Sequence, residues 1–509
     1  MRLNPKLLAA VCLLAPTAAF AQFQSSEFDA YVEKGMRDWE VPGVAVAIVR
    51  NDSILLLKGY GVRTVGKPEV VDANTLFALA SDSKAFTGIL LAMLVDDGKL
   101  NWDDRVIDHL PSFQLFDPWV TRELTLRDLI THRSGLARGD LLWTGGWDYD
   151  TGELLRRVRF LKPTWSLRSH YGYSNLMYAA AGEVAKSVTH RSWADLIRER
   201  ILIPLGMTAT TTTVTVLPNL ANVASPHAKV DDTVRVVRYT NMDQIPAAGA
   251  INSSAADMVR WLRFQLDSGR VGGKRLVSAR SFRETHTPQT VMRIDSAYRA
   301  MNPFTHLQSY AIGWNVSDYR GREMLRHAGN LSGMAAMVGL LPEERAGVVV
   351  LSNLEGNALR ESLMYKAFDM ILGAPPKDWS GENLAEARGI EAADRERERR
   401  RDAARVRGTH PSLPLERYAG AYEDPFYGSA SVTMSDGHLV LTLSPKSIGD
   451  VEHWNYDTFR VVWRDHRDGK EFISFILDPT GKVAEMRFAS GSQFAEETPV
   501  FRRVERAAK

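Results

Sequence analysis

Cysteine is almost absent from this chain, which has one, Cys12, among 509 residues. Cys12 lies in an N-terminal segment that we expect to be removed, so the mature chain has no thiol. That excludes disulfide bonds, thiolate metal sites and a cysteine nucleophile. A strong charge of either sign is also absent, because 63 Lys and Arg face 61 Asp and Glu, a net charge of +2. A net charge this close to zero gives no support for a nucleic-acid partner.

Long apolar runs are lacking too. The N-terminal run, residues 7–14, is shorter than the roughly 20 residues that a membrane span needs. Arg2 and Lys6 precede it, and Ala-Phe-Ala at 19–21 follows as a small-x-small cleavage site, a pattern typical of a secretory signal peptide over 1–21. An uncleaved membrane anchor is the alternative. The sequence therefore predicts a periplasmic or secreted protein with no stable membrane span once the signal is removed.

Two motifs of other hydrolase classes are missing. The chain has no Gly-x-Ser-x-Gly, which argues against an α/β-hydrolase, and no His-Glu-x-x-His, which argues against a zinc protease. Nothing in the sequence points to a metal or another cofactor, and we expect none.

Hydrophobic periodicity indicates an α/β (α+β) domain over residues 22–380. Apolar residues at helical spacing predict helices, and apolar β-type runs predict strands. The strands come early and late in this region, with helices between them, so one antiparallel sheet built from both ends of the domain and carrying a helical subdomain explains the order. The expected helices are 25–39, 84–96, 192–203 and 254–266, and the expected strands are 44–50, 54–60, 334–341 and 347–351.

The C-terminal part of the chain has a different residue pattern. Residues 381–412 are dense in charges of both signs and contain Pro411, which is typical of a solvated linker helix and a boundary; a polyanion site is the alternative. Residues 413–509 contain short alternating runs at 431–434, 439–443, 459–463, 472–477 and 483–488, separated by turn pairs such as Asp436-Gly437 and Asp468-Gly469. They predict a separate all-β domain, a sandwich or a small barrel.

Ser81 and Lys84 form the first candidate catalytic pair. Their spacing at the start of an apolar helix puts both side chains on one face. A partly desolvated lysine beside a serine loses its proton readily and can activate the hydroxyl. A helix-capping serine with an exposed lysine is the structural alternative, because Ser-x-x-Lys by itself is a weak signal.

Two further groups complete the candidate site. Tyr173 could be driven towards phenolate by nearby cations and shuttle a proton, while Asn175 could position a substrate amide or carbonyl. His327-Ala328-Gly329 precedes a late β run, where small residues allow a substrate backbone to approach and the histidine could supply a cation or a hydrogen bond. Taken alone, each group is more often structural.

The three groups together resemble the motifs of the serine β-lactamase and penicillin-binding-protein superfamily, Ser-x-x-Lys, Tyr-x-Asn and Lys/His-small-Gly. The chain is most similar to the class C β-lactamase-like branch, which includes peptidases and esterases. The likeness spans about residues 25–375, and the tail resembles the lipocalin-like domain of some members. Supporting stretches are residues 129–136, 204–207, 248–254, 327–333 and, in the tail, 452–459.

The resemblance implies an acyl-enzyme on Ser81, with Lys84 and Tyr173 as catalytic residues. It also implies an oxyanion hole made by the backbone N–H groups of Ser81 and Asn330. Asn175, His327, Gly329 and Asn330 become substrate-binding residues.

His327 departs from the lysine of true β-lactamases. Histidine is mostly neutral at pH 7, so a carboxylate-bearing β-lactam is not the expected substrate. A small-molecule or peptide substrate is expected: a D-amino-acid-type peptide or amide, an ester or a cell-wall fragment. A non-hydrolytic penicillin-binding or cell-wall sensor protein on the same fold is the alternative.

We expect the tail to shape access to the site without supplying catalytic groups. The sequence does not indicate the oligomeric state.

Overall fold

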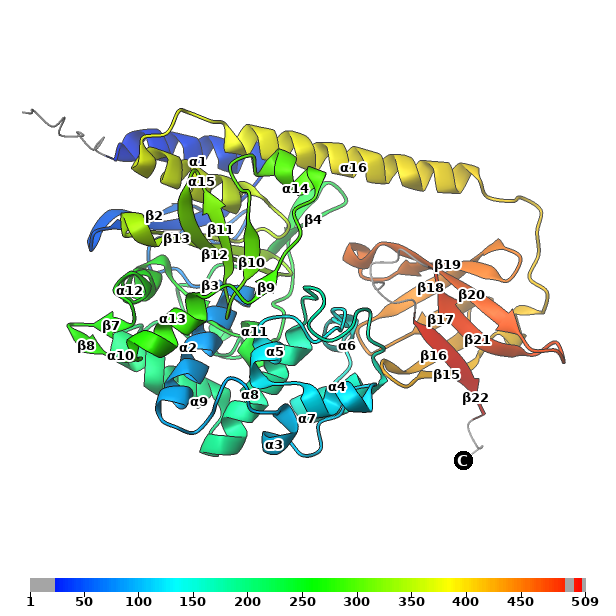
Figure 1. Ribbon diagram of the computed structural model, residues 1–509. Helices are drawn as coiled ribbons and strands as arrows, with labels where there is room; N and C mark the ends of the chain where they lie inside the picture. The colour runs from blue at the N-terminus through cyan, green and yellow to red at the C-terminus, as the bar shows by residue number, and fades with distance from the viewer. Residues whose placement is uncertain (1–22, 490–498, 506–509) are drawn as a thin grey trace, which may run out of the picture.

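The computed structural model describes residues 23–489 and 499–505 (Figure 1). The signal peptide expected over residues 1–21 lies outside them. A large α/β domain and an all-β barrel are joined by the long helix α16 (Trp379–Ala403). Within the described ranges, no helix is both long enough and apolar enough to cross a membrane.

The α/β domain is organised around an eight-stranded antiparallel sheet. Strands from the start of the domain pair with strands from its end, since β1 lies between β2 and β14. This confirms the expected sheet built from both ends of the domain. In spatial order the strands are β2 (Ser53–Gly61), β1 (Gly43–Arg50), β14 (Ala346–Ser352), β13 (Met334–Leu341), β12 (Arg322–Leu331), β11 (Asn315–Tyr319), β10 (Gln308–Tyr310) and β9 (Thr290–Val291).

Helices cover both faces of this sheet, which explains why β1 is apolar at almost every position. Side chains of a strand alternate between faces. Val44, Val46 and Ile48 pack towards α1 (Ser25–Trp39) and α15 (Leu359–Leu372). The intervening alanines and Val49 face the other core, which includes α12 (Ala255–Leu266). Figure 1 shows α1 and α15 on one side of the sheet and α12 on the other.

The helical subdomain lies between the early and late strands, as expected. Its centre is α2 (Ser83–Asp96), which is buried along nearly its whole length. The other helices around it are α3 (Val106–His109), α4 (Pro118–Glu123), α5 (Leu126–Ile130), α6 (Leu141–Thr144), α7 (Thr151–Arg157), α8 (Asn175–Thr189), α9 (Trp193–Ile197), α10 (Ile203–Leu205), α11 (Pro246–Gly249) and α13 (Ala279–His286). Helix α14 (Ser296–Met301) lies apart from them, between β9 and β10 in the chain, and Asn302 at its end accepts from Tyr365 of α15.

The C-terminal domain is a closed eight-stranded antiparallel barrel. It is closed because its first strand, β15, pairs with its last, β22. Sequence alternation predicted five of the strands but missed β15, β18 and β22, and it left sandwich and barrel open. The strands are β15 (Gly420–Asp424), β16 (Gly428–Ser435), β17 (His438–Thr442), β18 (Ile448–Asn455), β19 (Thr458–Trp463), β20 (Lys470–Leu477), β21 (Val483–Phe488) and β22 (Val500–Val504).

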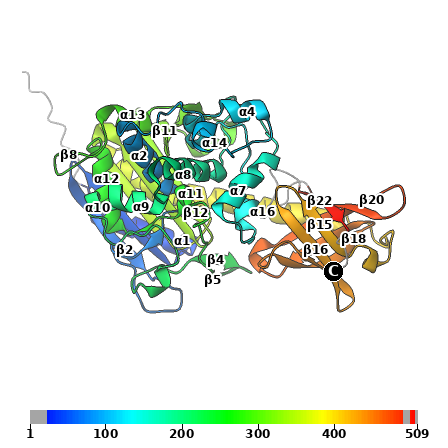
Figure 2. The same cartoon turned by 90° about the horizontal axis from the view of Figure 1, so that it is seen from below.

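The barrel also touches the α/β domain directly, away from α16. Figures 1 and 2 place it beside the helical subdomain near α6 and α7. Arg157 of α7 donates to the carbonyl oxygens of Pro425 and Phe426, at 3.2 and 3.1 Å. The hydroxyl of Tyr149 donates to the carbonyl oxygen of Tyr427 at 3.2 Å.

Candidate active site

Ser81 lies in a tight 3-10 turn, Ala80–Asp82, that leads directly into α2. The sequence placed it at the start of the helix; the structure places it just before. Strand β12 presses on this turn, because a Cβ on Gly329 would lie 2.0 Å from the carbonyl oxygen of Leu79. Only glycine fits at that approach, which brings the third motif against the first.

Lys84 points from the first turn of α2 towards Ser81. Its Nζ lies 3.0 Å from Oγ of Ser81, 2.8 Å from Oδ1 of Asn175 and 2.8 Å from the carbonyl oxygen of Ala248. The side chain is fully buried, and burial holds the pKa of the amine well below its ordinary value, although the Asp140 charge opposes the shift. The expected neutral lysine beside the serine therefore has a physical cause.

Tyr173 contacts the same oxygen from the other side. Its hydroxyl donates to Oγ of Ser81 at 2.7 Å. Burial raises the pKa of the phenol and outweighs the opposing effects of the bond to Ser81 and of Arg138, which lies over the ring. The expectation that cations drive Tyr173 towards phenolate is therefore wrong for the ligand-free protein, in which the phenol keeps its proton.

The segment carrying Tyr173 is fixed by His132. The amide of Gly172 donates to the carbonyl oxygen of His132 at 2.8 Å, and the amide of Ser174 donates to its Nδ1 at 3.2 Å. The imidazole also packs on the Tyr173 ring, with centroids 4.2 Å apart. Burial lowers the pKa of His132 well below its ordinary value, which leaves Nδ1 free to accept.

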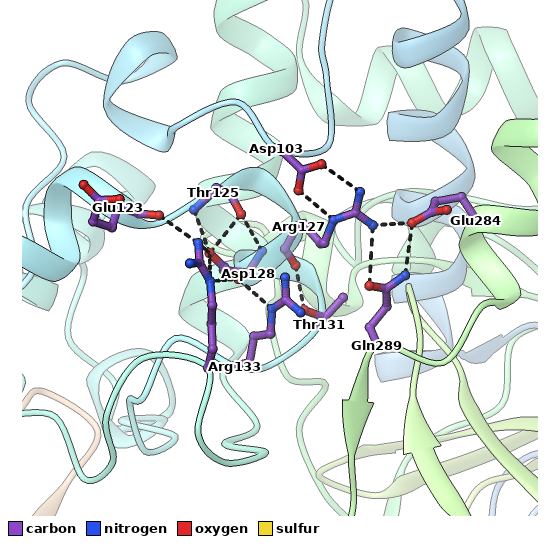
Figure 3. Close-up of polar contacts among 10 residues, drawn as sticks. Asp103, Glu123, Thr125, Arg127, Asp128, Thr131, Arg133, Glu284 and Gln289 are labelled. Carbon is purple, nitrogen blue, oxygen red and sulfur yellow. Dashed lines mark hydrogen bonds and ion pairs between the residues drawn. The ribbon is translucent and has the colours of Figure 1, made fainter.

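A buried carboxylate, Asp128, holds the loop that follows α5, and Figure 3 shows its contacts with Thr125 and Arg133. Asp128 accepts from Arg133 at 2.6 Å and from Arg168 at 2.8 Å, and it closes a capping box with Thr125 at the start of α5. These charge-assisted bonds keep the pKa of Asp128 below its ordinary value despite burial. Residues 129–136, which carry part of the family resemblance, thus act as a support for the second motif.

Asn175 is held on both sides of its amide. Oδ1 accepts from Lys84, and Nδ2 donates to Oδ1 of Asp140 at 3.0 Å. Asp140 also accepts from Arg138 at 2.7 Å and from the Trp143 indole at 2.9 Å. Sequence reasoning missed Asp140, because no motif marks it and it joins the site only through the fold of the 138–149 loop.

His327 is buried and uncharged. Its Nε2 lies 3.1 Å from the Tyr310 hydroxyl, and its Nδ1 lies 3.6 Å from Oδ1 of Asp82. Burial lowers the pKa of His327 to about 3 and raises the pKa of Asp82 well above its ordinary value. The distance between His327 and Asp82 suits an ion pair, but the pKa shifts of both groups favour their neutral forms. The cation suggested for His327 is therefore not formed near pH 7.

The end of β12 borders the site with an open edge. Pairing with β11 ends at Arg326, so the following residues have no neighbour from that strand. Asn330 lies on this stretch, and its Oδ1 accepts from Arg360. Arg360 also donates to the carbonyl oxygen of Gly329 at 2.7 Å and pairs with Glu361. Arg360 and Glu361 were not found from the sequence.

These groups line one cavity of about 870 Å³. Six of the seven residues predicted from the sequence lie in the cavity or hydrogen-bond within it, and Gly329 packs against Leu79 and Ala80, just before Ser81 in the chain. Every described residue of the lining falls between positions 80 and 361. His453 and buried Trp454 of the barrel border a separate pocket of about 420 Å³. Among the described residues, no group of three or more His, Cys, Asp or Glu could hold a metal ion.

Sequence comparison matches residues 28–368 to the family described as Beta-lactamase. Residues 404–504 match a domain of unknown function, DUF3471. The second match contains every strand of the barrel.

Curated relatives include hydrolases. Unguisins hydrolase ungD of Aspergillus violaceofuscus is 29% identical over 451 residues, covering 82% of this chain and 78% of that protein. Protein flp of Staphylococcus aureus (strain COL) is 26% identical over 335 residues, covering 64% and 63%.

Solved structures share the fold. The octameric penicillin-binding protein homologue from Pyrococcus abyssi is 18% identical with a TM-score of 0.63, covering 94% of this chain and all of that chain. A class C β-lactamase from Rhodobacter sphaeroides is 22% identical with a TM-score of 0.53, covering 68% of this chain and 98% of that chain.

Proposed function

The chain belongs to the beta-lactamase family, and from this premise we propose that it is a serine hydrolase working through an acyl-enzyme on Ser81. The observation that carries the proposal is the convergence of Lys84 and Tyr173 on one oxygen, at 3.0 and 2.7 Å, beside a cavity of about 870 Å³. A nucleophile with a base and an acid in hydrogen-bond reach is the arrangement that acyl transfer needs.

The hydrogen-bond partners determine which group donates and which accepts at each contact with Ser81. A neutral lysine amine has two N–H donors and one lone pair. Asn175 Oδ1 and the Ala248 carbonyl are pure acceptors, so they take both donors. The lone pair then faces Ser81, whose hydroxyl donates to it, while Tyr173 donates to Ser81. Lys84 is thus the general base for acylation, and the phenol of Tyr173 is the group that relays a proton.

Acylation follows from this order. Oγ of Ser81 attacks the substrate carbonyl carbon while its proton passes to Nζ of Lys84. The tetrahedral oxyanion is held by the backbone N–H groups of Ser81 and Asn330, the role implied by the family resemblance. When it collapses, the proton passes from Lys84, directly or through Tyr173, to the leaving amine or alkoxide. Water then attacks the ester carbon on Ser81 and gives its proton to Lys84, and the proton returns to Oγ of Ser81 as the C–O bond breaks and the acid is released.

The charges of the cavity favour an amide or ester over a carboxylate-bearing β-lactam. His327 is neutral, and the Arg360 guanidinium is engaged by Glu361 and Asn330. Neither offers the unpaired cation that would attract the carboxylate. We infer a D-amino-acid-type peptide or an ester as the substrate class. A screen of intact protein mass after brief exposure to peptides, esters and β-lactams would identify the acyl donor by its adduct.

The central test is Ser81→Ala. The variant should lose both turnover and labelling by a fluorophosphonate, while its unfolding transition stays close to that of the wild type. Labelling of the variant at the wild-type rate would contradict the assignment. An acyl adduct on wild-type Ser81 that never turns over would favour the sensor alternative.

Export is part of the proposal. It is supported by the positive, apolar and small-residue order of residues 1–21. The expected result is a mature protein in the periplasm or medium that begins at Gln22, as measured by intact mass. Full-length protein retained in the cell would contradict it.

A further inference from the structure

Asp140 determines the position of Lys84 through one intermediate. Its carboxylate accepts from Nδ2 of Asn175, whose Oδ1 accepts from Nζ of Lys84. Arg138 and Trp143 hold the same carboxylate from their own side. A displacement of Asp140 would therefore rotate or release the amide that orients the proposed base.

The loop that carries Asp140 cannot fix this geometry unaided. Asp140 precedes α6, which has four residues, and helices this short have little stability of their own. Glycines with positive φ flank the helix, Gly139 at 59° and Gly146 at 85°. Such positions give the chain freedom at both ends of α6, so the loop must be held from outside.

The barrel supplies that support at both ends of α6. Ser444 and Ser447 donate their hydroxyls to the carbonyl oxygen of Gly145, at 2.6 and 2.9 Å. On the side of Asp140, a Cβ added at Gly139 would lie 2.9 Å from the ring of Phe426.

The packing is close beyond α6 as well. A Cβ added at Gly146 would lie 2.7 Å from Cβ of Lys446, so the 444–447 turn of the barrel sits directly on the loop. Tyr149, further along, is bonded to the barrel backbone at Tyr427.

We propose that the barrel is a positioning element of the catalytic site, which holds the α6 loop (residues 139–149) and thereby places Asp140, Asn175 and Lys84. The inference rests on the proposed function of Ser81. It replaces the expectation that the tail only shapes access, and it gives the domain of unknown function a physical task. The barrel does this without lining the cavity, since the described lining residues all precede position 362.

The test removes both hydroxyls in the full-length chain, as Ser444→Ala/Ser447→Ala. The expected result is a loss of about tenfold or more in kcat for a small activated ester such as 4-nitrophenyl acetate, since misplacing a catalytic group by about 1 Å costs up to about 10²-fold. KM should change less than kcat, because no residue that lines the cavity is replaced. Ser474→Ala is the matched control: it removes a barrel hydroxyl that pairs with Thr458 at 2.8 Å, and it should leave kcat unchanged.

A double-mutant cycle separates positioning from general damage. If the barrel acts through Asp140, the serine double variant should slow an Asp140→Asn enzyme much less than it slows the wild type. Additive effects, or an unchanged kcat in the wild-type background, would overturn the proposal. Ser447→Ala alone keeps the Ser444 bond and should give an intermediate kcat, and Ser447→Thr, which keeps the hydroxyl, should restore it. These two variants keep the test valid if the double variant folds poorly.

Failure of this inference is distinguishable from failure of the proposed function. If Ser81 is not the nucleophile, Ser81→Ala retains fluorophosphonate labelling whatever the barrel does. If only the inference fails, Ser81→Ala loses labelling and the barrel variants keep the wild-type kcat.

Discussion

Replacing Lys84 with Met tests the protonation state on which the mechanism depends. Met retains most of the apolar stem and removes the amine. Two buried acceptors, Oδ1 of Asn175 and the Ala248 carbonyl, lose their donor, which costs about 1–3 kcal/mol each. This cost does not vary with pH, whereas the effect of removing a buried titrating group does.

The pH dependence follows from the lowered pKa. In the unfolded chain Lys84 titrates near 10.5 and stays protonated at pH 7–9, whereas the buried amine of the folded protein is neutral. The unfolded state therefore binds one more proton, and the free energy of unfolding of the wild type rises with pH. Between about pH 7.5 and about pH 8.5 the gain relative to Lys84→Met approaches about 1.4 kcal/mol, or about 1–2 °C in Tm for a chain of this size.

The assay is urea unfolding of both proteins at several pH values in this window, expressed as the difference between their free energies. Other titrating groups are common to both chains and cancel. Replacing the exposed Lys99 with Met is the control and should give a curve parallel to the wild type. A difference for Lys84→Met that stays constant with pH would mean that Lys84 is protonated in the folded protein. The reasoning that makes it the base would then be refuted.

Two further substitutions test neighbouring groups. Tyr173→Phe removes the donor to Ser81 and should lower the acylation rate about 10²-fold or more, measured by rapid-quench labelling; near-normal acylation would remove the phenol from the mechanism. His327→Lys introduces a cation beside Asp82 and should raise nitrocefin acylation relative to ester turnover; an unchanged or lower ratio would mean that His327 does not discriminate between these substrates.

Much of the fold was predictable because it rests on local periodicity. The helix over 25–39 and the strand over 334–341 agree with α1 and β13 to the residue. Closure of the barrel was not predictable, since it depends on pairing between β15 and β22, some 80 residues apart. Strands β15, β18 and β22 were missed as well.

Motif residues of the candidate site were also predictable, but their partners were not. Ser81 and Lys84 share a face because Lys84 lies three positions after Ser81. Tyr173 and His327 were found through family-like motifs. Asp140 has no such signal, because it reaches the site through a short loop held by another domain.

The available chemical groups could be identified from the chain alone: a serine followed three positions later by a lysine, a tyrosine, and a histidine in place of a lysine. The presence of a second, all-β domain was also evident there. The protonation states of these groups depended on how the folded chain packs around them. Burial keeps Lys84 and His327 neutral and Tyr173 protonated. Desolvation depends on everything packed around a group, most of it distant in sequence, so neither a protonation state nor the support of the α6 loop is written in any local pattern.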